Sequence, residues 1–264
     1  MALLNCNFFS YELGMNTQMQ VLLPEVRHEK RSLEQKKHRV LYCLHGHAQD
    51  HTSWGRLGNL ELLLGNTDII AVMPNALRSF YSNGEYGHRY FSFLTKELPV
   101  IIHNYFNGSI ERQDNFIFGY SMGGYGALKA ALSFPSKYAG AAVYSVAAEP
   151  FETLKWMGDN KLATVPDLER NLYNIFGSEE DFHRSDDNLK NLLEKLPLNR
   201  EQLPRIYHAC GTGDFTYSSN LALREALLKS GLATDYTYEE WNGEHDWYFW
   251  AIALEKSLRH FQIL

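Results

Sequence analysis

The sequence has few cysteines and no long hydrophobic run. Its three cysteines are Cys6, Cys43 and Cys210, an odd and sparse set that excludes a disulfide framework and fits a reducing compartment. No stretch approaches the roughly 20 apolar residues of a membrane-spanning helix. The first residues, MALLNCNFFSYELGMN, lack the basic start and long apolar core of a signal peptide. We therefore expect a cytoplasmic protein with no membrane partner.

An excess of positive charge is also lacking. The chain carries 25 Lys and Arg against 31 Asp and Glu, a formal net charge of −6. This balance argues against nucleic acid or an anionic membrane as the main partner. With 45% hydrophobic residues over 264 positions, the chain is long enough to bury a substantial core.

Short apolar strands alternate with helical stretches along most of the chain. Two strands, 5–13 and 16–24, are predicted to be joined by a turn at Gly14. Pro99 is expected to bend or split the helical stretch 90–106. The other predicted strands are 39–45, 68–74, 115–119, 139–147, 205–211 and 235–241, and the other predicted helices are 54–65, 122–134, 217–230 and 247–262.

This alternation predicts an α/β fold with a mostly parallel central sheet, helices on both faces and an antiparallel N-terminal strand pair. The polar, basic stretch 25–38 is expected to be a solvated loop. Residues 148–204 interrupt the alternation, and we expect them to form an insertion near one end of the sheet, as part of the substrate wall. No linker divides the chain, so we expect a single domain over residues 1–264.

The stretch FIFGYSMGGYGALKAAL carries the strongest chemical signal. An apolar strand leads directly into Gly-x-Ser-x-Gly, and a helix begins at once, which is the setting of a nucleophilic serine held on a tight turn. Gly119 and Gly123 flank Ser121 because side chains there would collide with the neighbouring strand and helix. The amide of Met122 is expected to face a developing oxyanion. The alternative is a glycine-rich turn with an incidental serine.

A serine nucleophile needs a base, and in this architecture an acid and a histidine follow it in chain order. Asp214 lies just beyond the predicted strand 205–211, and His245 just beyond 235–241. Both therefore fall at strand ends, where they can meet Ser121.

Other titratable side chains nearby are expected to have different roles. Glu239 and Glu240 lie within the last strand and could not reach the site from its tip. Glu244 and Asp246 are expected to be loop carboxylates, and His208 a packed core histidine.

The stretch LHGHAQDH allows two interpretations. His45, His47, Asp50 and His51 resemble the zinc motif HxHxDH, but Gln49 adds one residue to the spacing, and no convincing later ligands are found. In a serine hydrolase the same loop would supply a second oxyanion donor. The amide of His47 is the preferred donor and that of Gly46 the alternative. We therefore predict no metal and no organic cofactor.

Taken together, these blocks resemble the esterase D family of α/β-hydrolases, especially the small bacterial tributyrin esterases, which are acetylesterase-like. The resemblance extends over nearly the whole chain and includes LYCLHG, DIIAVMPN, FYSNGEYGHRYFSFLTKELP, GYSMGGYGALKAAL, CGTGDF and EHDWYFW. It implies an α/β-hydrolase fold with Ser121, Asp214 and His245 as the triad. It also implies that the aromatic loop near Tyr81, Tyr86 and Tyr90 borders the acyl pocket. His47 departs from the small or apolar residue usual in such relatives.

The expected activity is that of a serine carboxylesterase acting on short-chain acyl esters, acetyl to butyryl, with a small-molecule ester as its partner. Alternatives are an S-formylglutathione hydrolase, a feruloyl or acetylxylan esterase, a zinc hydrolase, or an inactive hydrolase fold that only binds. The resemblance implies a homo-oligomer, a dimer or tetramer. Aromatic side chains that could wall a small acyl pocket, or equally belong to the core, are Trp54, Phe80, Tyr81, Tyr86 and Trp247.

Overall fold

The computed structural model describes residues 1–25, 36–159, 167–196, 203–230 and 236–264. Eight strands form one sheet in the order β1-β2-β4-β3-β5-β6-β7-β8. Pairing is antiparallel from β1 through β2 to β4 and parallel across the rest. The strands are β1 Ala2–Ser10, β2 Met15–Leu23, β3 Arg39–Leu44, β4 Ile69–Pro74, β5 Asn115–Tyr120, β6 Gly140–Tyr144, β7 Arg205–Gly211 and β8 Tyr236–Trp241.

This sheet confirms the predicted fold class, including the antiparallel N-terminal pair. The turn between β1 and β2 contains Gly14, whose φ of +66° suits glycine. Most of the predicted loop 25–38 lies outside the described residues. The helices are α1 Ser53–Leu57, α2 Leu60–Leu64, α3 Tyr90–Ser92, α4 Leu98–Phe106, α5 Met122–Ser133, α6 Pro150–Asp159, α7 Leu168–Phe176, α8 Glu179–Arg184, α9 Leu189–Glu194, α10 Tyr217–Lys229 and α11 Trp247–His260, with a π-helical turn at Phe93–Glu97 and a 3₁₀ turn at Arg112–Asp114.

One predicted helix, 54–65, is two short helices instead. The chain breaks between α1 and α2 at Gly58 and Asn59, and Asn59 takes a left-handed conformation with φ of 51°. Because the apolar spacing continues on both sides of the break, the pattern alone did not reveal it.

Pro99 has the local effect expected of it in the stretch 90–106. Proline has no backbone N–H, so the carbonyl four residues earlier, that of Thr95, loses its helical donor. The chain passes through a π-helical turn just before Pro99. The Lys137 ammonium donates to the Thr95 carbonyl at 2.7 Å and replaces the missing donor.

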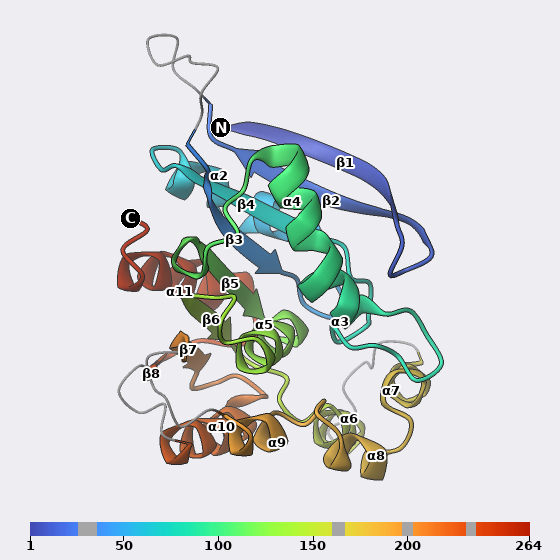
Figure 1. Ribbon diagram of the computed structural model, residues 1–264. Helices are drawn as coiled ribbons and strands as arrows, with labels where there is room; N and C mark the ends of the chain where they lie inside the picture. Colours follow the sequence, from blue (N-terminus) through green and yellow to red (C-terminus); the bar gives the residue numbers. More distant parts are fainter. Residues whose placement is uncertain (26–35, 160–166, 197–202, 231–235) are drawn as a thin grey trace.

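Helices cover both faces of the sheet (Figure 1). One hydrophobic cluster joins the sheet to α4, α5 and α10, and a second joins its other face to α1, α2 and α11. Between β6 and β7 the chain forms α6, α7, α8 and α9, which gather at the lower end of the molecule in Figure 1. The boundaries of an insertion at about 148–204, within a single domain, stay a prediction.

Within the described ranges, no helix is both long enough and apolar enough to cross a membrane.

Candidate active site

Ser121 lies on the sharp turn between β5 and α5. Its backbone has φ of 56° and ψ of −123°, a region that side-chain-bearing residues rarely occupy. A Cβ at Gly119 would lie 2.1 Å from the carbonyl oxygen of Gly123, and one at Gly123 would lie 2.1 Å from that of Leu44. The turn therefore requires glycine on both sides of the serine, for the steric reason that the sequence suggested.

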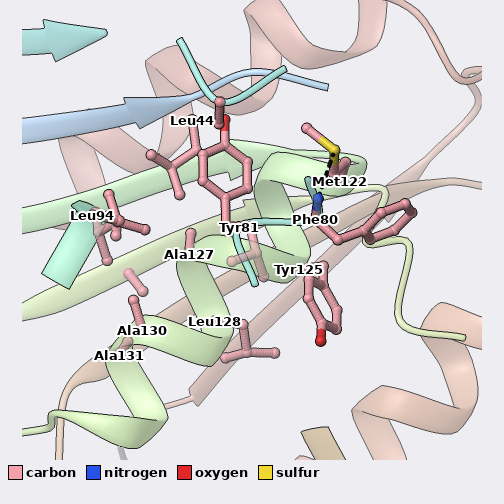
Figure 2. Close-up of a cluster of buried hydrophobic side chains, with 14 of the residues drawn as sticks. Leu44, Phe80, Tyr81, Leu94, Met122, Tyr125, Ala127, Leu128, Ala130 and Ala131 are labelled. Atoms are coloured by element: carbon pink, nitrogen blue, oxygen red, sulfur yellow. Dashed lines mark hydrogen bonds between the residues drawn. The ribbon is translucent and has the colours of Figure 1, made fainter. Parts of the chain in front are cut away.

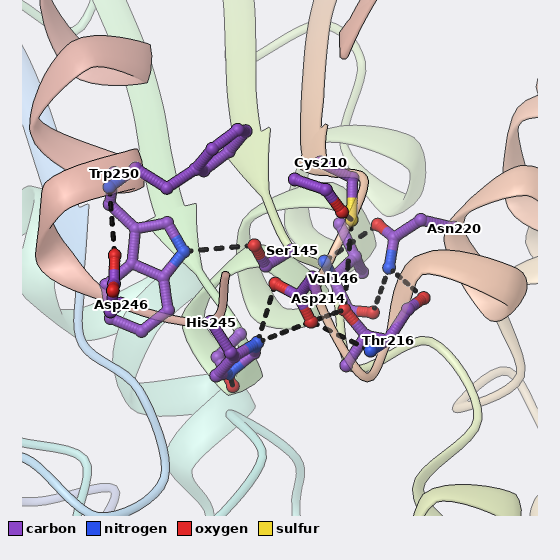
Figure 3. Close-up of polar contacts among 12 residues, drawn as sticks. Ser145, Val146, Cys210, Asp214, Thr216, Asn220, His245, Asp246 and Trp250 are labelled. Atoms are coloured by element: carbon purple, nitrogen blue, oxygen red, sulfur yellow. Dashed lines mark hydrogen bonds and ion pairs between the residues drawn. The ribbon is translucent and has the colours of Figure 1, made fainter. Parts of the chain in front are cut away.

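The structure brings Ser121, His245 and Asp214 together from the ends of β5, β8 and β7. His245 Nε2 lies 2.9 Å from Ser121 Oγ, and His245 Nδ1 lies 2.9 Å from Asp214 Oδ2 and 3.0 Å from Oδ1. Figure 3 shows the aspartate and the imidazole facing each other. A protonated Nδ1 leaves Nε2 free to accept the serine proton, which is the arrangement of a serine nucleophile with its base.

Asp214 is fixed by donors other than His245. Its Oδ1 accepts hydrogen bonds from the backbone N–H and the hydroxyl of Thr216, each at 2.8 Å. Burial alone would raise the pKa of Asp214. However, the hydrogen bond and charge of His245, with hydrogen bonds from Ser145 and the Thr216 backbone, hold it below its usual value. The carboxylate therefore stays ionised and oriented toward the imidazole.

The imidazole of His245 is packed between aromatic rings. The Phe215 ring lies 4.3 Å from it, centroid to centroid, and the Trp250 ring meets it edge-on at 5.0 Å. Trp156 of α6 stacks on Phe215 at 5.4 Å. Trp250 Nε1 donates to Ser145 Oγ at 3.0 Å, as Figure 3 shows. These contacts restrict the ring orientations open to His245.

The loop after β3 begins with His45, which is a buried structural residue. Its Nε2 accepts a hydrogen bond from the Ala76 amide at 3.0 Å, so Nδ1 carries the proton and donates to the Gly46 carbonyl at 2.8 Å. Burial lowers the pKa of His45 to about 4. Among the residues that the structure describes, no group of three or more His, Cys, Asp or Glu side chains is placed to hold a metal ion.

His208 is a second buried structural histidine, as the sequence suggested. It lies in β7, accepts from the Tyr236 hydroxyl at Nδ1 (2.8 Å) and donates from Nε2 to Asn220 Oδ1 (2.7 Å). Burial also lowers its pKa to about 4. Both histidines are thus neutral in the folded protein at pH 7.

The two buried histidines make stability depend on pH. Below the unfolded pKa of about 6.5, the unfolded chain binds protons that the folded protein accepts only near pH 4, so the free energy of unfolding falls as pH drops through this window. At pH 5 we expect each histidine to cost roughly 2 kcal/mol relative to pH 7. Urea unfolding at several pH values measures this. His208→Gln should flatten the dependence, and an unchanged slope would contradict the assignment.

His47 and Gly46 differ in how far their amides are already engaged. Gln49 N donates to the Gly46 carbonyl at 3.2 Å and closes a turn in which the amide of His47 is not used. Burial raises the pKa of Tyr120, and hydrogen bonding with the Gly46 backbone works against that rise. The amide of His47 therefore stays the predicted oxyanion donor of this loop, with that of Gly46 as the alternative.

The side chain of His47 connects this loop to α7. Its Nε2 lies 3.1 Å from Asn171 Oδ1, and its ring packs on Phe80 at 5.6 Å. Burial lowers the pKa of His47. The ring is therefore neutral at pH 7 and forms part of the cleft wall.

A cleft of about 290 Å³ opens at Ser121. Four of its lining residues, Pro150, Thr153, Met157 and Leu168, come from the stretch 148–204, which therefore forms part of the cleft wall. The rest of the lining is Gly46, His47, Ala48, Gln49, Phe80, Tyr120, Ser121, Met122, Ala147, Phe215, Thr216, His245 and Trp250. The wall is mainly apolar, and its polar side chains include His47 and Gln49 on the loop after β3.

Four aromatic residues predicted to border the substrate do not line this cleft, and the prediction is corrected here. Tyr81 lies among the buried side chains of Figure 2. Its hydroxyl donates to the His45 carbonyl at 3.2 Å. Tyr86 is 77% exposed and lies by a different hollow. Trp54 is fully buried, and Trp247 packs edge-on against it at 5.4 Å.

From the same aromatic loop, Phe80 does reach the cleft. Its amide donates to the Met122 sulfur at 3.3 Å, which fixes the loop on the first residue of α5, as Figure 2 shows. Tyr90 is buried in the core.

The competing carboxylates have other partners. Glu239 pairs with Lys256 at 2.6 Å, and Glu240 accepts from the Tyr217 hydroxyl at 3.1 Å. Asp246 caps α11 by accepting from the Phe249 amide at 3.0 Å. Each of these carboxylates is therefore explained by a contact other than the His245 imidazole.

Several contacts around His245 were not predicted from the sequence. Phe215 follows Asp214 directly and Trp250 lies five residues after His245, so adjacency to the predicted triad was the available signal. Ser145 carries no such signal, because its hydroxyl meets Trp250 only through the fold.

The fold and the three contacting side chains define an α/β-hydrolase of the serine type. The sequence model of the Esterase family, described as "Putative esterase", matches residues 10–261, and the chain belongs to this family. It is 31% identical to an acetyl esterase of Caldicellulosiruptor saccharolyticus over 95% of this chain and 94% of that protein. The predicted resemblance to the esterase D family is confirmed, and the protein is a carboxylic ester hydrolase.

Two solved structures from Staphylococcus aureus are similar over 98% of both chains. The fluorophosphonate-binding serine hydrolase FphF has a TM-score of 0.85 and 29% identity. The S-formylglutathione hydrolase FrmB has a TM-score of 0.84 and 30% identity.

Proposed function

We propose that this esterase hydrolyses short-chain acyl esters through an acyl-enzyme on Ser121. His245 takes the serine proton as Oγ attacks the ester carbonyl, and Asp214 stabilises the charged imidazole. The imidazole then protonates the departing alcohol, and water, activated by the same His245, releases the acid. The hydrogen-bonded chain from Ser121 Oγ through His245 to Asp214 is the observation that carries this proposal.

The amides of Met122 and His47 stabilise the oxyanion in this proposal. Met122 is the first residue of α5, so its N–H has no carbonyl partner within the helix. The helix dipole adds positive potential at the same point. The His47 amide is left free by the turn that closes over it. Two such donors act on the charge that develops in the transition state.

The cleft supports a small acyl group, acetyl to butyryl. Its volume of about 290 Å³ must hold the acyl group and part of the alcohol, and its wall is mainly apolar. The similarity to an acetyl esterase points the same way.

The three cysteines are free, which supports a location in the cytoplasm.

A panel of p-nitrophenyl esters of increasing acyl length tests this proposal. We expect kcat/KM to be highest between acetyl and butyryl and to fall at least about tenfold by octanoyl, because longer chains exceed the cleft. An optimum at octanoyl or longer would contradict the proposed substrate class.

S-formylglutathione hydrolysis is the second candidate, favoured by the similarity to FrmB over 98% of both chains. The same triad serves a thioester, so the two functions differ in the substrate, which is a formyl thioester in one and an acetyl-to-butyryl ester in the other. Assays of S-formylglutathione and acetylated xylan alongside the ester panel distinguish the two candidate functions. A kcat/KM for S-formylglutathione that exceeds every ester's by about 100-fold would replace the first proposal with the second.

A further inference from the structure

Gln49 is a polar side chain in the cleft wall that the triad and the oxyanion donors do not use. It lies on the loop after β3, two residues beyond His47, and is partly exposed within the cleft. In the sequence it stood out only because it lengthens the spacing between His47 and Asp50. Its contacts in the structure give it a more definite role.

Two donors fix the orientation of the Gln49 amide. Trp247 Nε1 lies 3.1 Å from Gln49 Oε1, and the Tyr120 hydroxyl lies 2.6 Å from the same oxygen. An indole N–H can only donate, so the atom facing it must be the amide oxygen. The Tyr120 hydroxyl donates its proton to this oxygen. The oxygen therefore has both of its lone pairs occupied.

This orientation leaves the NH₂ group of Gln49 available to a ligand. Within the described part of the chain, Nε2 has no hydrogen-bond partner. It is also not one of the buried polar atoms left without a partner, so it is accessible from the cleft. The amide thus presents two N–H donors at the cleft, and the two anchoring bonds prevent it from turning its oxygen there instead. A pre-oriented donor loses little entropy when it binds an acceptor.

The anchors also connect Gln49 to the aromatic residues around His245. Trp247 lies two residues after His245. The Tyr120 ring stacks on Trp250 at 4.3 Å, and Trp250 in turn contacts His245. The alcohol of the ester must lie near His245, because the imidazole gives it a proton as it departs.

We propose that Gln49 is a specificity-determining residue whose Nε2 donates a hydrogen bond to an acceptor oxygen in the leaving group. It selects esters of oxygenated alcohols, such as polyol or sugar esters, over esters of simple alkanols. This inference rests on the proposed function of Ser121 and extends it to the alcohol of the substrate.

A matched pair of acetate esters tests the proposal. In 2-methoxyethyl acetate an ether oxygen, which can only accept, replaces one CH₂ of butyl acetate. The measured quantity is the ratio of kcat/KM for the ether ester to kcat/KM for the butyl ester, in the wild type and in Gln49→Glu. Glutamate keeps the shape and an acceptor for Tyr120 and Trp247 but replaces the NH₂ donor with an oxygen.

We expect Gln49→Glu to lower this ratio about three- to tenfold, the usual range for one lost hydrogen bond. Intrinsic reactivity of the two esters cancels when the variant's ratio is divided by that of the wild type, and any effect of the new charge on His245 cancels within the variant's ratio. Gln49→Met, which lacks both donor and charge, should lower it as well and serves if the glutamate variant does not fold. A ratio unchanged in both variants, because water already satisfies the amide, would overturn the proposal.

Moving the ether oxygen to the acyl side provides the second comparison. Butyl methoxyacetate against butyl butanoate should show a ratio that Gln49→Glu leaves within about twofold of wild type. A larger change there would place Nε2 on the acyl side and overturn the assignment to the leaving group. Absence of wild-type hydrolysis of all four esters would instead count against the proposed function itself.

Discussion

Replacing Ser121 with alanine is expected to lower kcat for p-nitrophenyl acetate by at least about 10⁴-fold. The hydroxyl oxygen forms the acyl-enzyme, and His245 Nε2 lies 2.9 Å from it, in position to take its proton. Alanine leaves the backbone of the turn unchanged, so the fold should persist. Steady-state kinetics, with circular dichroism melting to check the fold, measure the effect.

Ser133→Ala is the matched control for this substitution. Ser133 is the last residue of the same helix and does not line the cleft. It should keep the wild-type kcat within about twofold. If Ser121→Ala retained a tenth of the activity or more, another nucleophile would have to be found. A zinc hydrolase would in addition lose its activity to a chelator, and an inactive binding fold would show none in the wild type.

Replacing Asp214 with asparagine is expected to lower kcat by roughly 10³–10⁴-fold. The carboxylate requires a proton on His245 Nδ1, whereas an asparagine NH₂ facing that nitrogen would move the proton to Nε2. In that tautomer the imidazole cannot accept the serine proton. The substitution also removes the negative charge that stabilises the imidazolium during attack.

Asp246→Asn controls for the loss of a nearby carboxylate. Asp246 is adjacent to His245, yet its side chain caps α11, a role that asparagine performs about equally well. We expect nearly wild-type kcat for this variant. Equal losses in the two variants would mean that general charge near the site, and not the contact with His245 Nδ1, explains the effect of Asp214.

Local sequence patterns predicted the central sheet and the contact among Ser121, Asp214 and His245. A strand, a Gly-x-Ser-x-Gly turn and a helix in register predict the position of Ser121, because a side chain at either glycine would overlap backbone. Asp214 and His245 each follow a late parallel strand, and such strand ends meet at one edge of a sheet. These inferences needed only spacing and chain order.

The wall of the cleft could not be predicted in this way. Tyr81 and Phe80 are adjacent aromatic residues, but only Phe80 reaches the cleft, because the neighbouring hydroxyl bonds to the His45 carbonyl in the core. The orientation of the Gln49 amide depends on a hydrogen bond from Trp247, which lies 198 positions away in the sequence. The break at Asn59 depends on a left-handed backbone that apolar spacing does not record.

The position of the covalent adduct formed by a fluorophosphonate tests the nucleophile most directly. Such a reagent phosphonylates an activated serine and stays attached, and FphF, a similar protein, is a fluorophosphonate-binding hydrolase by its name. Mass spectrometry of peptides from the inactivated protein should find a single phosphonyl group, on Ser121. An adduct on another residue, or full inactivation with Ser121 unmodified, would contradict the proposed mechanism.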